Sequence, residues 1–409
     1  MHTPTRRFLS RIAKTGLAAA MALSLAQGAQ AAPATAAVNT TGLAVDDASV
    51  TVGILHSLSG TIAITESSVV DAEKLAIDEI NAAGGVLGRQ IKVVVEDGAS
   101  DWPTFAEKAN KLLGSDKAAA VFGCYTSASR KAVLPVFERG KGLLYYPTYY
   151  EGLEQSPNII YTGQEATQQN IAAVEWLIKE KGAKTFYLLG SDYIWPRTTN
   201  KIAKKVIERL GGKVVAEEYA PLGHTQFGSI INKIKLRKPD VVLSTIVGGS
   251  NVALYKQLKA AGLDGGNKTL MAFAITEEEV RGIGAENVTG VYVPMGYFQT
   301  VDNEANRKFV AAFKARYGED RVIGDTMEAG YIAPYLWKAA VEKAGSFDVE
   351  KVAAASAGLE LDAPEGMVKL HDSNHHLYKY TRIGQIRADG LMDIVHETGL
   401  IEPNPYPEL

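Results

Sequence analysis

From Val50 onward, the apolar residues follow two patterns that take turns along the chain. Short runs made mostly of apolar residues, such as Val50–Leu55, are typical of buried strands. Between these runs, apolar residues recur at the three-to-four-residue spacing of one helix face, first over 68–83, and Gly84 and Gly85 follow that segment as helix C-caps often do. Strands that alternate with helices predict parallel sheets that are covered by helices on both faces.

The predicted elements form two successive runs. In the first run, strands are expected at 50–55, 91–95, 118–122 and 143–146, and helices at 68–83, 105–113 and 128–138. In the second run, strands are expected at 185–189, 214–218, 241–245 and 270–273, and helices at 170–180, 199–210, 227–236 and 252–261. Two more helices are expected at 309–317 and 329–344. Two runs of the same grammar predict two lobes of similar build.

The predicted fold class is therefore α/β, with two doubly wound parallel-sheet lobes joined by a three-segment hinge. Lobe 1 is expected over 49–162 and 296–362, and lobe 2 over 163–295 and 363–409. The tail after Leu361 is strand-like and polar, so it must pack on lobes already formed. The chain is expected to cross between the lobes near 161–164, near 294–297 and within 363–380.

The N-terminus has the pattern of an export signal. Arginine and lysine residues precede the apolar run 16–26, which is too short to span a bilayer. Ala29-Gln30-Ala31 forms a small-residue cleavage motif, so the signal peptide 1–31 is expected to be removed near Ala31 and the mature protein to be periplasmic. A loose twin-arginine match leaves the export route open. The Ala/Thr-rich segment 32–48 is expected to be a flexible leader.

Composition narrows the possible partners and cofactors. The formal net charge is -3, and no basic patch argues for nucleic acid. The single cysteine, Cys124, cannot form an internal disulfide and does not sit at the cleavage site, so a lipid-modified N-terminus is not expected. The common dinucleotide, nucleotide, hydrolase and zinc-protease motifs are missing from the sequence, so we expect no enzyme and no cofactor.

Two residue groups leave alternatives open. Cys124 ends a predicted strand, where it is either a small buried residue or the nucleophile of an amidase. His375 and His376 could suggest a metal site, but adjacent residues of a strand face opposite ways, and no other ligand stands at the required spacing. We therefore favour the buried cysteine and no metal.

In a doubly wound sheet, ligands bind beyond the carboxyl ends of the strands. The segments that follow these ends are 56–61, 123–127, 145–150, 190–195 and 245–250. They are rich in hydroxyl, glycine and aromatic residues, and Asp192 is their only acidic residue. Because a buried ammonium group needs a carboxylate partner, this composition favours a small, flat, neutral and polar ligand over an amino acid.

Three tyrosines, Tyr125, Tyr146 and Tyr193, fall at strand ends, where each offers a flat apolar face and a polar tip. We interpret them as ligand contacts, although such a cluster can also be a packed seam between elements. Ser127 is expected to cap the helix that follows it, to contact the ligand, or both.

Several of these segments resemble the type I periplasmic binding proteins, and within them the urea and short-chain-amide branch. The resemblance lies in LHSLSGT (55–61), AAGGVLGR (82–89), GCYTSASRKAVLPVFE (123–138), YPTYYEGL (146–153), GSDYIWPR (190–197), Pro364–Gly366 and Asn374–His376. It covers about 49–405, essentially the whole mature chain.

The resemblance implies a Venus-flytrap protein of an ABC importer, which captures urea between two closing lobes and delivers it to permease subunits in the inner membrane. It implies a monomer, with short-chain amides such as formamide or acetamide as the alternative ligands, bound by an importer component or an amide sensor. The implied ligand-binding residues, with Tyr149 included beside its neighbours, are Tyr125, Ser127, Tyr146, Thr148, Tyr149, Tyr193, Val247 and Gly248.

The chain departs from the urea importers at three places. These importers more often have Trp at the position of Tyr125, Val-Gln at Thr148-Tyr149 and Asn-Gly-Asp at 247–249. At Tyr125 and Thr148 the chain is instead similar to cytoplasmic amide-sensing regulators, so urea and small amides both remain open as ligands.

Overall fold

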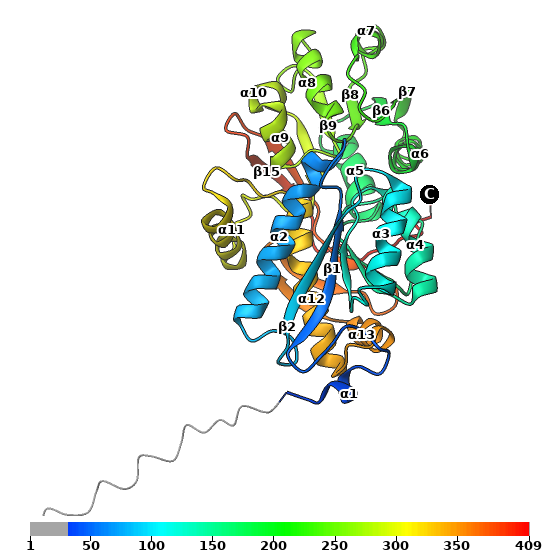
Figure 1. The fold of residues 1–409 in the computed structure, drawn as a ribbon. Coiled ribbons are helices and arrows are strands. Elements are labelled where there is room, and N and C mark those ends of the chain that lie inside the picture. Colours follow the sequence, from blue (N-terminus) through cyan, green and yellow to red (C-terminus); the bar gives the residue numbers. More distant parts are fainter. Residues whose placement is uncertain (1–31, 409) are drawn as a thin grey trace, which may run out of the picture. The chain divides into compact units, whose positions relative to one another are not determined.

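The computed structural model describes residues 32–408, and the chain from Pro33 onward forms one compact unit (Figure 1). The signal segment expected at 1–31 lies outside the described residues. In the described part of the chain, no helix combines the length and apolar character that a membrane crossing requires.

Lobe 1 is built on a five-stranded sheet in which all strands are parallel, in the order β2-β1-β3-β4-β5. Its strands are β1 (Ser49–His56), β2 (Gln90–Asp97), β3 (Val121–Gly123), β4 (Leu144–Tyr146) and β5 (Ile159–Tyr161). Its helices are α2 (Ala63–Ala82), α3 (Trp102–Gly114), α4 (Ser127–Gly140), α11 (Glu304–Tyr317), α12 (Asp325–Ala344) and α13 (Val349–Ser356).

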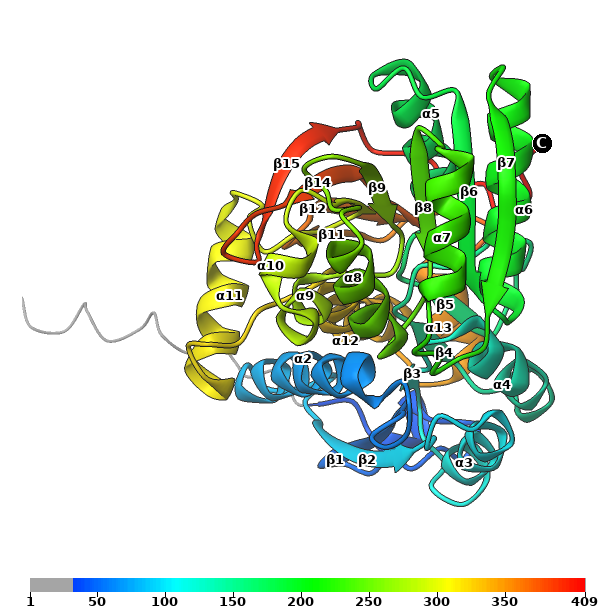
Figure 2. The ribbon, with the colours of Figure 1, turned by 90° about the horizontal axis from the view of Figure 1, so that it is seen from above.

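The central strand β1 is buried on both faces. Val52 and Ile54 pack into a core with Trp337 of α12, whereas a Cβ at Gly53, on the other face, would meet Leu112 of α3 at 2.9 Å. Helices α2 and α12 pack against each other on one face of the sheet, and α3 and α4 pack on each other on the opposite face (Figures 1 and 2). This double cover explains why the strand reads as a continuous apolar run.

Lobe 2 has a seven-stranded sheet in the order β15-β14-β10-β9-β8-β6-β7. Its strands are β6 (Thr185–Ser191), β7 (Lys213–Ala220), β8 (Val241–Thr245), β9 (Thr269–Ala272), β10 (Tyr292–Met295), β14 (Arg382–Ile386) and β15 (Met392–Glu397). Its helical segments are η1 (Thr167–Ile171), α5 (Ala172–Lys179), α6 (Ile194–Arg209), α7 (Gly228–Arg237), α8 (Ser250–Ala260), α9 (Glu277–Ile283) and α10 (Ala285–Val288). The strands β6 to β10 are parallel, and β14 and β15 add an antiparallel edge.

The segment 363–378 belongs to lobe 1 and not, as expected, to lobe 2. It supplies β12 (Gly366–Leu370) and β13 (Leu377–Tyr378), which join β11 (Glu360–Ala363) in a small antiparallel sheet. Val368 and Leu377 of this sheet are buried in the core of lobe 1. The polar tail therefore hides a short apolar face, and the chain crosses to lobe 2 only before β14.

The leader expected to be flexible over 32–48 is packed against lobe 1. It forms the short helix α1 (Thr35–Val38), and Val38 is buried. The buried guanidinium of Arg89 donates to the carbonyl oxygens of Pro33 and Asp46, both at 2.7 Å. The expectation was wrong because the leader is held in place by hydrogen bonds from Arg89, which lies far along the chain, and the composition of the leader does not show such contacts.

Buried charges tie the lobe crossings together. The ammonium of Lys379 donates to the carbonyl oxygen of Thr162 at 3.0 Å and pairs with Glu365 at 2.7 Å. One oxygen of Asp325 accepts the backbone N–H groups of Gly296 and Tyr297, each at 2.9 Å. Each of the three crossings is therefore anchored by a charged side chain with no exposed surface.

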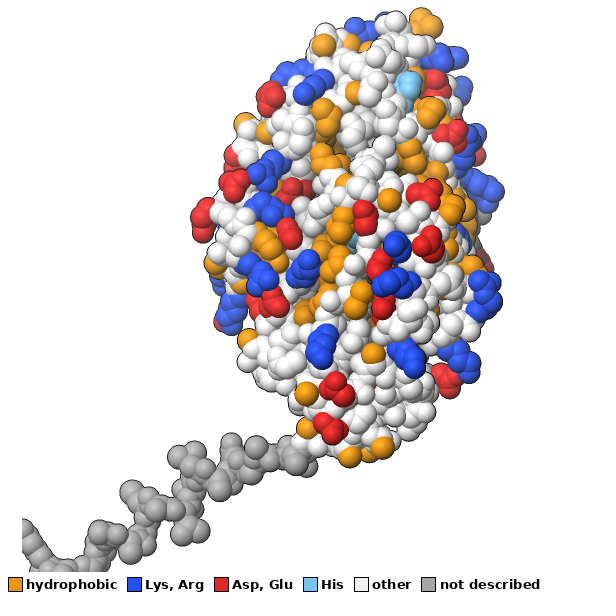
Figure 3. All heavy atoms as spheres, viewed as in Figure 1, with side chains coloured by type: hydrophobic (Ala, Val, Ile, Leu, Met, Phe, Trp, Pro, Cys, Tyr) orange, Lys and Arg blue, Asp and Glu red, His pale blue; other side chains and the backbone are white. Residues whose placement is uncertain are grey.

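The two lobes lie against each other. Helix α2 of lobe 1 contacts α9 of lobe 2, and α4 of lobe 1 contacts α6 of lobe 2 (Figure 2). Basic and acidic side chains are interspersed over the face shown in Figure 3.

Candidate functional site

The candidate site lies at the carboxyl ends of the two parallel sheets. In lobe 1 the order of strands reverses between β1 and β3, and in lobe 2 between β6 and β8, which are the topological switch points where ligands bind in such sheets. The loops after these strands meet across the lobes, since a Cβ at Gly248 would lie 3.2 Å from the carbonyl oxygen of Thr61.

The turn between β3 and α4 is tightly folded. A Cβ at Gly123 would lie 2.1 Å from the carbonyl oxygen of Leu55, and the next residue, Cys124, has a left-handed φ of 60°. Burial raises the pKa of the Cys124 thiol well above its usual value, so the structure gives no sign of an activated thiolate.

The cap of α4 is Thr126, whose Oγ1 accepts the backbone N–H of Ser129 at 3.0 Å. Ser127, which was expected to cap the helix, is instead its first residue. The expectation missed by one residue because both positions carry a hydroxyl that can cap a helix. The Ser127 hydroxyl is consequently free for other partners.

A buried charged network takes up the Ser127 hydroxyl. Its Oγ donates to Oε2 of Glu151 at 2.5 Å and accepts from Nη1 of Arg130 at 3.1 Å. Arg130 also pairs with Glu151 at 3.1 Å and with Glu154 at 2.7 Å. Each of these side chains is at most 5 % exposed. Nothing in the sequence indicated that Arg130 and Glu151 would be buried together beside Ser127, so this network was not predicted.

Tyr146 stands beside this network. The Arg130 guanidinium lies 4.9 Å from the centre of its ring, and the Tyr146 hydroxyl donates to the carbonyl oxygen of Tyr125 at 2.6 Å. Tyr193 of lobe 2 is a neighbour of Tyr146 and Glu151. Burial raises the pKa of both tyrosines, which therefore remain neutral hydroxyls at ordinary pH.

A second aromatic group joins the lobes next to these residues. Tyr149 of lobe 1 packs on Trp195 of lobe 2 with ring centres 5.5 Å apart. The Tyr125 hydroxyl is a neighbour of Tyr149 and of Thr326, at the start of α12. Trp195 could have been predicted as a site residue, because it stands in the same strand-end loop as Tyr193. Thr326 could not, because it stands at the start of a helix and follows no predicted strand.

Glu279 of α9 brings a carboxyl group to the same region. Its Oε2 accepts from the backbone N–H and the hydroxyl of Thr276, at 2.7 and 2.6 Å, which caps the helix. It lies close enough to Tyr125 and Tyr149 to add to the effect of burial, which raises the pKa of both tyrosine hydroxyls. Burial raises the pKa of Glu279. Glu279 was not predicted from the sequence, because it stands beyond the strand-end loops.

The remaining candidates also lie where the lobes face each other. Thr148 is 3 % exposed, and its Oγ1 has no hydrogen-bond partner among the described residues. The backbone N–H of Val247 donates to Oγ of Ser191 at 3.1 Å, and Gly248 has a left-handed φ of 62°. All eight predicted residues thus fall at the facing ends of the two sheets, and their contact with a ligand stays a prediction.

The histidine pair has structural partners. His376 stacks on the ring of Tyr161 at 4.2 Å and bonds to the Tyr150 hydroxyl, while Nδ1 of His375 bonds to the carbonyl oxygen of Ser156 at 3.1 Å. Among residues 32–408, no cluster of histidine, cysteine or acidic residues is arranged to hold a metal ion.

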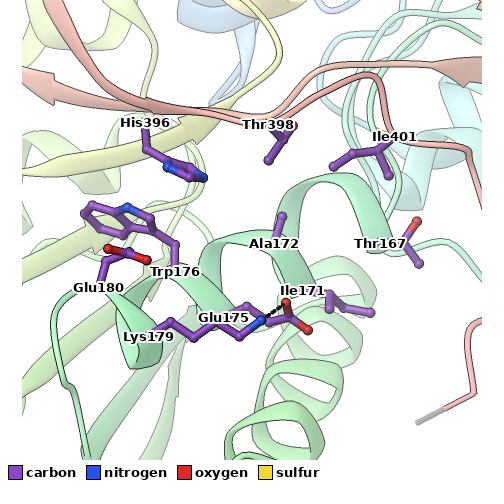
Figure 4. Close-up of a pocket in the computed structure, with 10 residues that line it drawn as sticks. All are labelled: Thr167, Ile171, Ala172, Glu175, Trp176, Lys179, Glu180, His396, Thr398 and Ile401. Atoms are coloured by element: carbon purple, nitrogen blue, oxygen red, sulfur yellow. Dashed lines mark hydrogen bonds and ion pairs between the residues drawn. The ribbon is translucent and has the colours of Figure 1, made fainter.

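A surface hollow of about 390 Å³ lies elsewhere, between α5 and the segment after β15 (Figure 4). Its walls include Trp176 and His396, and the ion pair between Lys179 and Glu175 runs along its edge. None of the eight candidate residues lines it, so we do not assign the ligand to this hollow.

Curated relatives of the chain include amino-acid-binding proteins. A leucine-, isoleucine-, valine-, threonine- and alanine-binding protein of Pseudomonas aeruginosa is 26% identical over 302 residues, which is 71% of this chain and 78% of that protein. A Leu/Ile/Val-binding protein homolog of Brucella suis is 23% identical and covers 87% of this chain and 93% of its own. A limonene hydroxylase of Geobacillus stearothermophilus is 35% identical over 113 residues, but these make up only 21% of that protein.

Solved structures share the fold. A solute-binding protein of an ABC transporter from R. palustris, in complex with 4-hydroxybenzoate, matches with a TM-score of 0.78 and 23% identity over 86% of this chain and 97% of its own. A leucine-binding protein of Thermotoga maritima matches with a TM-score of 0.76 and 21% identity over 85% of this chain and 98% of its own. These likenesses confirm the two-lobed α/β fold.

The family assignment rests on nearly the whole described chain. Residues 50–409 match the family of periplasmic binding protein domains, and both sheets with their facing loops lie inside that match. The expectation of a binding protein rather than an enzyme agrees with this family. The chain belongs to the periplasmic binding protein domain family.

Proposed function

We propose that this protein is the exported solute-binding component of an ABC importer and that it captures urea, or a short-chain amide such as formamide or acetamide, between its lobes. The observation that carries the proposal is that four hydroxyl-bearing side chains at or just after the ends of β3 and β4 are buried, namely Tyr125, Ser127, Tyr146 and Thr148. Such groups suit a small neutral molecule with both N–H donors and a carbonyl acceptor.

Charge at the site supports a neutral ligand. The cation beside Tyr146 is Arg130, and its guanidinium is already paired with Glu151 and Glu154. A ligand carboxylate would therefore compete with two buried carboxylates for the same cation. The ring contact between Tyr149 and Trp195 also favours a ligand of few atoms over one with a benzene ring.

Glu279 favours a second candidate, a small zwitterionic amino acid. Its buried carboxyl, a neighbour of Tyr125 and Tyr149, could pair with an ammonium group. Against this reading, one of its oxygens already serves Thr276 as a helix cap.

Thermal unfolding with candidate ligands tests the proposal. The four heavy atoms of urea, at a ceiling of about -1.5 kcal/mol each, give roughly -6 kcal/mol or a Kd of tens of micromolar. Urea at about one hundred times Kd, which is a millimolar concentration, then stabilises the protein by about 2.7 kcal/mol. This concentration is far below the molar urea that denatures proteins. We expect urea, formamide or acetamide to raise Tm, with leucine and 4-hydroxybenzoate as controls. A shift with leucine or 4-hydroxybenzoate alone would contradict the ligand class.

Export and the permease partner belong to the same proposal. Mass spectrometry of the native protein is expected to find an N-terminus near Ala32. A protein that keeps Met1 in the cytoplasm would favour an amide sensor with the same ligand site.

A further inference from the structure

The hydrogen of the Ser127 hydroxyl is already committed. A serine hydroxyl has one hydrogen to donate and can accept at two positions. The hydrogen goes to Oε2 of Glu151 at 2.5 Å, and a carboxylate that is ion-paired with Arg130 has none to give back. One acceptor position receives Nη1 of Arg130 at 3.1 Å. Ser127 can therefore offer a ligand only its second acceptor position.

The Tyr146 hydroxyl, like that of Ser127, already donates its only hydrogen. It donates its hydrogen to the carbonyl oxygen of Tyr125 at 2.6 Å, and a carbonyl cannot reverse that bond. Like Ser127, it has only acceptor capacity left for another partner. Thr148 differs, because its buried Oγ1 has no partner among residues 32–408 and keeps its hydrogen to donate.

We propose that Glu151 and Arg130 are positioning residues that fix Ser127 as a hydrogen-bond acceptor, so that the site selects ligands by their N–H groups. Together with Tyr146, Ser127 then demands donors from the ligand, while Thr148 can serve a carbonyl oxygen. This inference rests on the proposed function and deepens it, because it names the feature of the ligand, its N–H groups, by which the site would select urea and amides over acceptor-only molecules.

An isosteric ligand series tests the selection. Urea, acetamide and acetone each have four heavy atoms in the same planar arrangement around a carbonyl carbon, and they carry two, one and no NH₂ groups. Calorimetric titration or ligand competition should give affinities that fall in that order, by about tenfold for each NH₂ group replaced by methyl. Acetone that binds as tightly as acetamide would overturn the inference.

Glu151→Gln changes the polarity without changing the shape. The amide oxygen must face Nη2 of Arg130, which donates there at 3.1 Å, so the amide NH₂ faces Ser127. Ser127 then accepts from both neighbours and turns its own hydrogen toward the ligand. We expect urea binding to fall about tenfold, and the ratio of urea to acetone affinity to fall with it.

Glu154→Gln is the matched control. Glu154 also pairs with Arg130, through Nε at 2.7 Å, but makes no contact with Ser127. It should lose stability as Glu151→Gln does and keep the wild-type ratio, because a merely structural role does not alter ligand selection. If Glu151→Gln does not fold, Ser127→Ala replaces it, with weaker urea binding and unchanged acetone binding expected.

The outcomes separate the two proposals. Tight urea binding with an unchanged ratio in Glu151→Gln overturns the inference and leaves the proposed function standing. Absence of urea and acetamide binding in the wild-type protein overturns both.

Discussion

The buried side chain of His56 lies between two buried glutamates of lobe 1. Its Nδ1 lies 3.0 Å from Glu66 and its Nε2 lies 3.1 Å from Glu73, and all three side chains have no exposed surface. Burial alone would lower the pKa of His56, but the two carboxylates outweigh burial and raise it to about 10. The imidazole is therefore a cation at neutral pH, where it offsets the buried negative charge.

This pKa predicts how stability depends on pH. Because the folded pKa lies above the unfolded value of about 6.5, the contribution of His56 is complete below pH 6.5 and is lost as pH rises towards 10. His56→Gln should lower the free energy of unfolding by about 3–5 kcal/mol at pH 6, because two buried carboxylates lose their partner. Guanidinium unfolding from pH 6 to 10 measures both effects.

The difference between variant and wild type is the informative quantity. It should shrink steadily above pH 6.5, and a difference that stays constant to pH 10 would mean that His56 is neutral. His224→Gln is the control, since that ring bonds only to the nearby Gln226 carbonyl.

At the scale of elements, periodicity located most of the fold. The strand expected at 241–245 is β8 without change, and the helix expected at 199–210 is α6 with an earlier start at Ile194. Strand β8 is buried along its whole length and α6 buries one face, so the spacing of their apolar residues predicts the element correctly. Strand β5 has only three residues, without the longer apolar run that marked β3 and β4, and it was missed.

Long-range polar contacts account for what periodicity could not give. The order of the leader depends on Arg89 and Asp348, and the Ser127 network depends on Glu151, which stands 24 positions further along. The eight candidates were chosen at predicted strand ends, and the structure places them at or just after the ends of strands β3, β4, β6 and β8, while their contact with a ligand stays a prediction. The acceptor to which the Ser127 or the Tyr146 hydroxyl donates its hydrogen lies far along the chain, and no local sequence pattern identifies it.

The packed leader gives a prediction for one element. One oxygen of Asp348 accepts the backbone N–H of Thr40 at 2.7 Å, and the Thr41 hydroxyl donates to it at 3.0 Å. Although burial opposes the charge, the bonds from Thr40 and its neighbours hold the pKa of Asp348 well below its usual range. This stabilisation is present above about pH 3.8, the unfolded value, and is lost as pH falls further.

Asp348→Ala should lower the free energy of unfolding by about 1–3 kcal/mol at neutral pH and expose the leader to proteases. Limited proteolysis followed by mass spectrometry detects cuts within 33–47. Glu350→Ala is the control, because Glu350 lies on the first turn of α13, next to Asp348, and its ion pair with Lys141, at the end of α4, is an exposed one. Equal protease resistance in the Asp348 variant would show that other contacts hold the leader.

At the scale of the molecule, the approach of the lobes depends on a glycine. Gly248 faces Thr61 across the boundary, where a Cβ would lie 3.2 Å from the carbonyl oxygen of Thr61, so a large side chain does not fit without moving the lobes. Gly248→Phe should hold the lobes apart and weaken ligand binding by at least tenfold, because both walls of the site must meet to enclose a small molecule. Small-angle scattering with ligand should show a larger radius than that of the liganded wild type.

Gly211→Phe separates this effect from backbone strain. Gly211 has a comparable φ of 82°, but a Cβ there meets nothing within 4 Å. It should lose stability and still close. If both variants bind and compact like wild type, Gly248 does not limit the approach of the lobes.

The packing of Trp195 on Tyr149 has a consequence for how the protein can be observed. Of its tryptophans, Trp102 and Trp337 lie within lobe 1 and Trp176 on lobe 2, and only Trp195 contacts the opposite lobe. Separation of the lobes would bring this indole into water and shift its emission to the red, against a constant background from the other three. The fluorescence of Trp195 would therefore report any separation of the lobes without an added label.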